Sequence, residues 1–141
     1  INGRNPIEAH EYLGRSVKGK DVIIVDDMIS SGDSMLDIAM ELKRRKARRI
    51  FAATTYALFT DGIQEFQKCY EQGVIDKIFA TNLTYRRPEL KDAPWFVEVD
   101  MSKYIAKLID ALNYDESLGG IVNPAQRILN LMQRRNCGEK I

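Results

Sequence analysis

The sequence predicts an α/β fold in which a mostly parallel β-sheet is flanked by α-helices. Short β-branched apolar runs alternate along the chain with segments whose apolar residues recur at helical spacing. The helical segments are about 10–14 residues long, which suits right-handed crossovers between parallel strands. The 141 residues, of which 45% are hydrophobic and 29% charged, fit one globular domain with an apolar core.

The first predicted strand is centred on residues 22–25, and the segment 26–32 is expected to form a turn. Because the strand residues are wholly apolar, they indicate a central parallel strand that is covered on both faces. In the next helix Ser34 and Asp37 predict a capping box at the start. Its apolar residues share one face: Met35, Ile38, Ala39 and Leu42.

The remaining elements continue the same alternation. Further strands are expected over 49–56, 75–81 and 95–99, and further helices over 62–72, from about 104 to 112, and from Asn123-Pro124 onward. The polar segment 83–94, which contains two prolines, is expected to be a loop.

The two ends of the chain carry separate expectations. We treat residues 1–141 as one domain, and the polar segment 134–141 is expected to be a mobile tail. The first residue is Ile1, not methionine, so we expect the chain to be either processed or part of a longer protein.

The charge balance gives the chain no basic field. Lys plus Arg total 21 against 20 for Asp plus Glu, so the net charge predicts neither nucleic-acid nor membrane binding. No apolar run approaches the roughly 20 residues that span a bilayer. The basic cluster 43–49 is interpreted as a solvated helix end. Two cysteines, Cys69 and Cys137, form no disulfide framework or zinc pattern, which favours a reducing, cytoplasmic location.

The segment that carries chemistry follows the first strand. Ligands of open α/β sheets lie beyond the carboxyl ends of strands, and a helix N-terminus favours an anion. Ser30, Ser31 and Ser34 supply hydroxyl groups, and Gly32 permits a positive φ or a close approach of the backbone to a ligand. The loop contains no Lys or Arg. A phosphate here would therefore be held by backbone N–H groups and hydroxyls.

Asp26 and Asp27, just before this loop, would repel a bare phosphate. They fit a ligand that also offers a cis-diol, or a Mg²⁺ ion bridging to it. A ribose 5-phosphate has both ends. Because adjacent strand residues point to opposite faces, Asp26 is the preferred sugar ligand of the two. An ordinary strand-to-helix turn with a good N-cap is the alternative interpretation.

Residues 22–34 resemble the phosphoribosyl pyrophosphate fingerprint of type I phosphoribosyltransferases, which has several hydrophobic residues, two acids, a spacer and a Ser/Thr-Gly-x-Ser/Thr loop. Val25-Asp26-Asp27-Met28 is written as in the ribose-phosphate pyrophosphokinases of that superfamily. Two further stretches, 5–14 and 81–88, resemble a longer bacterial branch of the same kinases. The resemblance runs from about Asn5 to Met132 and implies a phosphoribosyltransferase-like sheet.

The resemblance also implies residue roles. Asp26 and Asp27 would bind the ribose hydroxyls, and the segment Ser30, Ser31, Gly32, Asp33 and Ser34 would wrap the 5-phosphate. Two positions depart from the family, where many members have an acid in place of Ser30 and a glycine in place of Asp33. These departures affect the individual contacts within the loop.

The family reaction transfers the pyrophosphoryl group of MgATP to the 1-hydroxyl of ribose 5-phosphate, which gives phosphoribosyl pyrophosphate and AMP for nucleotide biosynthesis. The resemblance implies the C-terminal half of such an enzyme, with the ATP site and catalytic residues elsewhere, so the chain alone is expected to be inactive. Family members assemble as dimers and hexamers. Two alternatives stay open, a nucleobase phosphoribosyltransferase and a non-catalytic regulatory or associated subunit that binds phosphoribosyl ligands.

Overall fold

The computed structural model describes residues 14–137 of the chain. The chain divides into two compact units at the junction of Asp100 and Met101. The first unit contains the β-sheet and the second contains only helices among its described residues.

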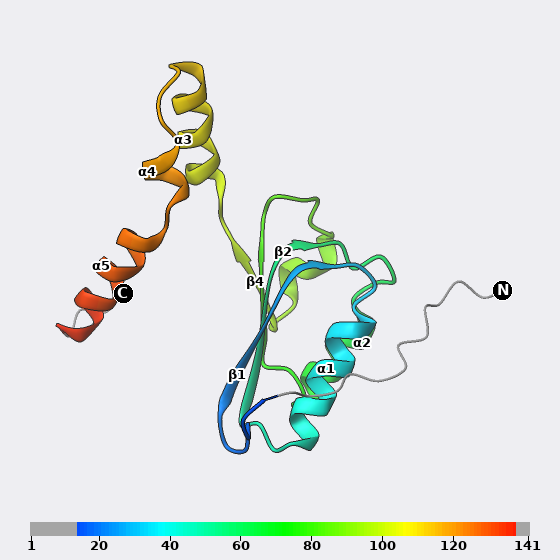
Figure 1. The fold of residues 1–141 in the computed structure, drawn as a ribbon. Helices are drawn as coiled ribbons and strands as arrows, with labels where there is room; N and C mark the ends of the chain where they lie inside the picture. Colours follow the sequence, from blue (N-terminus) through cyan, green and yellow to red (C-terminus); the bar gives the residue numbers. More distant parts are fainter. Residues whose placement is uncertain (1–13, 138–141) are drawn as a thin grey trace. The chain divides into compact units, whose positions relative to one another are not determined.

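The first unit is built on a parallel sheet, which confirms the predicted α/β fold (Figure 1). Its strands lie in chain order, so every strand pairs in parallel with the next one. The strands are β1 (Asp21–Ile29), β2 (Arg49–Ala57), β3 (Lys77–Thr81) and β4 (Phe96–Val99). Parallel pairing in chain order requires each connection to return to the same end of the sheet. The carboxyl ends of all four strands therefore lie at the same end of the sheet.

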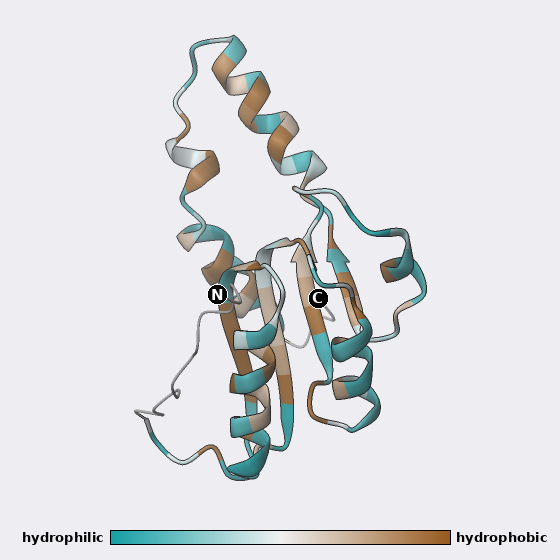
Figure 2. Cartoon of the chain, turned by 90° about the vertical axis from the view of Figure 1, so that its right-hand side faces the viewer, coloured by the Kyte–Doolittle hydropathy of each residue, from teal (hydrophilic) through white to brown (hydrophobic). Residues whose placement is uncertain are grey.

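Two helices cover one face of this sheet (Figures 1 and 2). They are α1 (Asp33–Arg44) and α2 (Gln64–Glu71), and a short 3₁₀-helix, η1 (Pro88–Asp92), interrupts the connection between β3 and β4. The predicted apolar face of α1 is largely correct, since Met35, Leu36, Ala39 and Leu42 are its buried residues. Helices on one face and strands below them form a single core, as amphipathic patterning requires.

Aromatic side chains fill the core beneath α2. Phe59, Phe66 and Trp95 are each at most 1% exposed. The indole Nε1–H of Trp95 donates a hydrogen bond to Oε1 of Gln67 at 2.7 Å, so its polar atom is satisfied although the ring is buried. Cys69 is also buried, and burial raises the pKa of its thiol, which is the behaviour of a small core residue.

The prediction that the first strand is central and covered on both faces is wrong for the described residues. β1 is an edge strand of the sheet, and its side chains Ile23 and Val25 are 59% and 75% exposed. Helices α1 and α2 both lie on the opposite face. The apolar composition of the strand indicated that both of its faces are buried. Among residues 14–100, however, only one face of the sheet is covered by helices.

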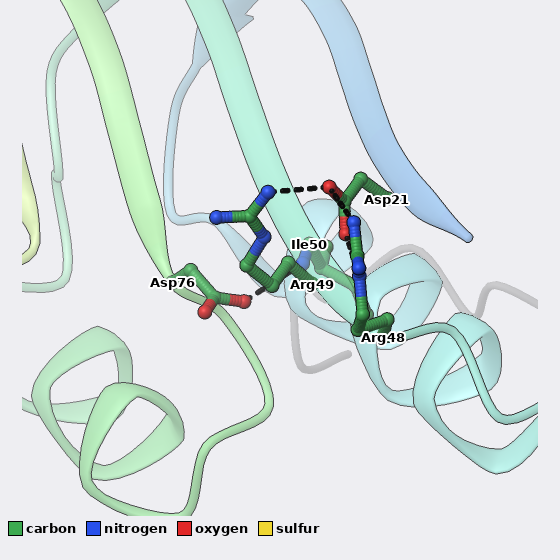
Figure 3. Close-up of polar contacts among 5 residues, drawn as sticks. All are labelled: Asp21, Arg48, Arg49, Ile50 and Asp76. Atoms are coloured by element: carbon green, nitrogen blue, oxygen red, sulfur yellow. Dashed lines mark hydrogen bonds and ion pairs between the residues drawn. The ribbon is translucent and has the colours of Figure 1, made fainter. Parts of the chain in front are cut away.

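Ion pairs fasten the amino ends of the strands (Figure 3). The guanidinium of Arg48 donates to both carboxylate oxygens of Asp21 at 2.7 Å, and Arg49 Nη2 donates to the same carboxylate at 2.5 Å. Oδ2 of Asp76 accepts the backbone N–H of Ile50 at 2.8 Å. A bidentate arginine–carboxylate pair holds β1 and β2 in register at this end.

These pairs also account for much of the basic cluster 43–49. Besides the two arginines bound to Asp21, Arg44 and Arg45 each form an ion pair with Glu41 at 2.7 Å, one helical turn earlier. The four arginines of the cluster are therefore paired with acids of the same unit.

The second unit consists of α3 (Ser102–Asn113), α4 (Gly119–Val122) and α5 (Ala125–Asn136). The predicted N-cap at Asn123 is wrong by one residue, since the N-cap is Pro124 and α5 begins at Ala125. Oδ1 of Asn123, one residue before the cap, accepts the N–H of Ala125 at 3.0 Å. α5 extends through residues 134–136 of the expected tail. No helix described between residues 14 and 137 is long and apolar enough to cross a membrane.

The Asp21 cluster should make stability depend on pH. Hydrogen bonds from Arg48 and then Arg49 hold the pKa of the Asp21 carboxyl well below its ordinary value of 3.8. Its contribution is therefore complete above the unfolded pKa and is lost as pH falls below that value. The melting temperature of wild type should exceed that of Asp21→Asn by a constant amount from about pH 5 to 7, and the difference should shrink below about pH 4. A difference that stays constant to pH 2 would contradict this account.

The aromatic core should be the most sensitive packing site of the first unit. Trp95 is 0% exposed, so Trp95→Ala should lower the free energy of unfolding by about 3–5 kcal/mol, measured by urea titration. Tyr85, in the same β3–β4 connection, is 74% exposed and provides the control. Tyr85→Ala should change that free energy by no more than about 0.5 kcal/mol. Equal losses in both variants would refute the assignment of the core.

Candidate functional site

The loop of residues 30–32 leaves the carboxyl end of β1 and leads into α1. Ligands of open α/β sheets lie beyond the carboxyl ends of strands, and this loop occupies such a position. Every residue that the sequence predicts for the site lies in this loop or directly beside it, within residues 26–34. Asp26 and Asp27 belong to β1, Ser30, Ser31 and Gly32 to the loop, and Asp33 and Ser34 to the first turn of α1. The local chain path therefore brings all seven to one edge of the sheet.

The two acids lie inside β1, not in a turn, because the strand extends through Ile29. The predicted turn over 26–32 is thus limited to its last three residues. Asp26 pairs with Thr54, which is buried beneath the helices, so Asp26 lies on the helix-covered side of the sheet. Alternation directs Asp27 to the other side. Both side chains are exposed, and Oδ1 of Asp26 accepts the N–H of Asp27 at 2.9 Å.

The start of α1 lacks a side-chain cap. The predicted capping box of Ser34 and Asp37 is wrong, since the N-cap residue is Gly32 and α1 begins at Asp33. Gly32 has φ 101°, a left-handed conformation that glycine adopts without strain. Its carbonyl accepts the N–H of Leu36 at 2.9 Å, which is the first bond of the helix. The N–H groups of the first turn precede that bond and remain suited to bind an anion.

The side chains around these N–H groups are polar. Ser30 and Ser34 are exposed, and Oγ of half-buried Ser31 accepts a long hydrogen bond of 3.4 Å from the N–H of Asp33. The carboxylate of exposed Asp33 also lies in this first turn. It complements the helix dipole but competes with any anionic ligand for the same field.

A second loop supports the first, and sequence reasoning did not identify it. The N–H of Leu58 donates to the carbonyl of Ile29, and the N–H of Thr60 donates to the carbonyl of Ser30, both at 2.9 Å. The guanidinium of Arg87 donates to the carbonyls of Leu58 and Thr60 at 3.4 Å. The signal available in sequence was the Leu58-Phe59-Thr60 segment directly after the second strand, which must end beside the first.

The chemistry of the donor set follows from these positions. Carboxylates near the strand end can accept hydrogen bonds from sugar hydroxyls, and uncapped N–H groups with serine hydroxyls can donate to phosphate oxygens. Among residues 14–137, no group of three or more His, Cys, Asp or Glu side chains could hold a metal ion by itself. Any divalent cation here would need oxygen atoms from the ligand as well as the carboxylates.

Part of the stretch 5–14, which carries one of the sequence resemblances, lies outside the described residues. The other stretch, 81–88, spans the end of β3 and the following connection, at the same edge of the sheet as the loop. Within it Arg86 forms an ion pair with Glu98 of β4 at 2.9 Å.

Solved structures agree with this fold. The crystal structure of phosphoribosylpyrophosphate synthetase from Mycobacterium smegmatis superposes with a TM-score of 0.65 over 72% of this chain and 33% of that chain, at 24% sequence identity. At that level of identity the similarity establishes the fold alone.

Curated relatives extend the comparison to sequence. The chain is 30% identical over 119 residues to the ribose-phosphate pyrophosphokinase of Vibrio cholerae, which covers 84% of this chain and 37% of the relative. It is 27% identical over 118 residues to the enzyme of the same name from Mycoplasma pneumoniae, covering 83% of this chain and 35% of the relative. The chain therefore spans little more than a third of the length of these relatives.

The family model described as the phosphoribosyl synthetase-associated domain matches residues 10–123. The matched range includes β1, the loop and α1, together with the rest of the sheet. With the α/β fold and the pyrophosphokinase relatives, this match shows that the chain belongs to the phosphoribosyl synthetase-associated domain family.

Proposed function

We propose that this chain supplies the ribose 5-phosphate site of a ribose-phosphate pyrophosphokinase and forms the C-terminal half of the longer enzyme. The observation that carries the proposal is the short loop of residues 30–32, which joins a strand bearing two acids to a helix start without a side-chain cap. Acids on one side and the backbone N–H groups of a helix start on the other match the diol and the phosphate of one sugar phosphate.

Each end of the ligand has its own partners in this proposal. Asp26 and Asp27 accept hydrogen bonds from the ribose hydroxyls, with Asp26 the stronger candidate because it pairs with Thr54 above the buried core. The 5-phosphate lies against Ser30, Ser31 and the first turn of α1, where Ser34 adds a hydroxyl. The phosphate charge is then balanced by the helix dipole and not by a lysine or arginine of the loop.

The reaction proposed for the whole enzyme is transfer of the pyrophosphoryl group of ATP to the 1-hydroxyl of the bound sugar, giving phosphoribosyl pyrophosphate and AMP. Mg²⁺ bound with ATP would neutralise charge on the transferred group, and the Asp26 and Asp27 carboxylates are hard oxygen donors that fit it. This chain contributes the orientation of the sugar. Lysine, arginine and metal-ligand residues for the transfer would come from outside it, so the isolated chain should not turn over.

Two features support a place in a larger assembly. The chain covers 37% of its Vibrio cholerae relative, so most of a pyrophosphokinase of that length lies outside it. In addition, the open face of the sheet exposes Ile23 and Val25, and a contiguous apolar surface on a strand is typical of a protein contact. We therefore also propose an oligomeric enzyme in which this face is covered. The cytoplasmic location is a separate proposal, which rests on the cysteine pattern of the sequence.

A non-catalytic associated subunit is the second candidate, favoured by the description of the matched family as a synthetase-associated domain. Such a subunit could keep the sugar-phosphate site as a sensor. The two candidates differ in the longer protein, since only an enzyme forms AMP from ATP in the presence of ribose 5-phosphate. Production of AMP by the full-length gene product, and none by this chain alone, is the expected result. A full-length product that binds the sugar phosphate but forms no AMP would favour the associated subunit.

Removing the charge of Asp26 should test the diol contacts. Calorimetric titration with ribose 5-phosphate should show saturable binding by the wild-type chain, and Asp26→Asn should weaken it by about ten- to a hundredfold, the usual cost of a charged hydrogen bond. Asp27→Asn should weaken it less. Asp21→Asn, at the other end of β1, is the matched control and should leave the affinity unchanged at pH 7. Folded wild-type chain that binds no ribose 5-phosphate would contradict the proposed function.

Neutralising Asp33 should have the opposite effect on affinity. Its carboxylate lies in the first turn of α1, where it repels the proposed phosphate. Asp33→Asn should therefore tighten ribose 5-phosphate binding by about two- to fivefold at low ionic strength, and added salt should reduce the gain. Asp37→Asn, one turn further along α1, should have a smaller effect. Weaker binding by Asp33→Asn would instead show that this carboxylate contacts the ligand favourably.

A further inference from the structure

We propose that Phe66 positions the phosphate-binding loop: its buried ring supports Gly32 and thereby fixes the N–H groups at the start of α1. The inference rests on the proposed function, because it concerns how that site is held in shape. Phe66 lies in α2, more than thirty residues along the chain from the loop, and is 1% exposed.

The contact between Gly32 and Phe66 is close. A β-carbon added to Gly32 would overlap the Cζ and Cε2 atoms of the Phe66 ring. Gly32 therefore has two reasons to be glycine, the positive φ of 101° and the ring directly beside its α-carbon. From the sequence, Gly32 was expected either to adopt a positive φ or to let the backbone approach a ligand closely. In the structure the group close to Gly32 is the Phe66 ring of the protein core.

The Phe66 ring cannot yield easily, because other rings hold it. Phe59 meets it edge to face with centroids 4.9 Å apart, and Trp95 stacks on it at 5.8 Å with an interplanar angle of 22°. Trp95 is in turn fixed through its hydrogen bond to Gln67, the residue after Phe66. Close-packed rings of this kind have little room to move, so they hold the Phe66 ring in place against Gly32.

The segment after β2 completes the support on the other side of the loop. Phe59 has φ 48°, an unusual conformation for a bulky residue, and its side chain is fully buried. With Phe59 turned into the core, the N–H groups of Leu58 and Thr60 on either side donate to the carbonyls of Ile29 and Ser30. Backbone strain in a residue that holds a candidate site points to a functional constraint.

Two contacts therefore define the loop, backbone hydrogen bonds at Ile29 and Ser30 and the Phe66 ring at Gly32. If the ring is removed, the hydrogen bonds remain but Gly32 can move into the vacated space. The N–H groups that follow Gly32 would then lose their alignment. The affinity for a phosphate depends on the alignment of these N–H groups, whereas the stability of the sheet and helices does not.

The test compares Phe66→Leu with two controls of similar chemistry. Ile78→Val removes a methylene from a fully buried residue of β3. Phe51→Leu removes a half-buried ring from the side of β2 that faces away from the helices. The contact itself is measured first, in the wild-type chain, as a nuclear Overhauser effect between the Gly32 α-protons and the Phe66 ring. Ribose 5-phosphate dissociation constants and melting temperatures then follow for wild type and each variant, with titrations performed well below the lowest melting temperature.

Support for the inference is an Overhauser effect in wild type and a dissociation constant that rises about tenfold or more in Phe66→Leu, with both controls within about twofold of wild type. Amide shifts of residues 31–34 should change in Phe66→Leu and not in the controls. No Overhauser effect in the folded chain, or unchanged affinity in folded Phe66→Leu, overturns the positioning role alone. An Overhauser effect without sugar-phosphate binding by wild type rejects the proposed function, and the positioning role falls with it.

Discussion

The parallel pairing of β1 with β2 is the constraint on which the candidate site depends. Register pairs Ile29 with Ala57 at the carboxyl ends, so the two loops that follow must leave the sheet side by side. Their contact is then made by backbone groups, from Leu58 and Thr60 to Ile29 and Ser30, and does not require particular side chains. At the other end the Asp21–Arg48 pair holds the same register. A slip of one residue would turn every side chain of β1 to the wrong face and separate the loops.

Charge is distributed differently at the two ends of β1. At the amino end the acid Asp21 is matched by two arginines, so the cluster stabilises the sheet and is chemically satisfied. At the carboxyl end Asp26, Asp27 and Asp33 are exposed. The guanidinium of Arg87, in the β3–β4 connection, donates to the backbone carbonyls of Leu58 and Thr60. These exposed acids are solvated and Asp33 also complements the helix dipole, so they leave the loop open to a ligand without destabilising the fold.

The open face of the sheet agrees with the short length of the chain relative to its relatives. Ile23 and Val25 have the composition of a doubly covered strand but are exposed in the first unit. An apolar edge strand with an uncovered face tends to associate, and natural proteins cover such surfaces. The difference between what the sequence of β1 demands and what residues 14–100 provide supports the proposal that the sheet is completed within a larger enzyme.

The sequence by itself determined the α/β class and the order of the elements, and it singled out the segment proposed as the site, because apolar periodicity and glycine and serine placement are local properties. It did not determine that β1 runs through Ile29, or that α1 begins at Asp33 with Gly32 as its N-cap and without the predicted box of Ser34 and Asp37. Those outcomes depend on pairing with β2 and on the Phe66 ring beside Gly32. Only tertiary structure joins residues so distant in sequence, since a local pattern carries no information about which ring will lie beneath a loop.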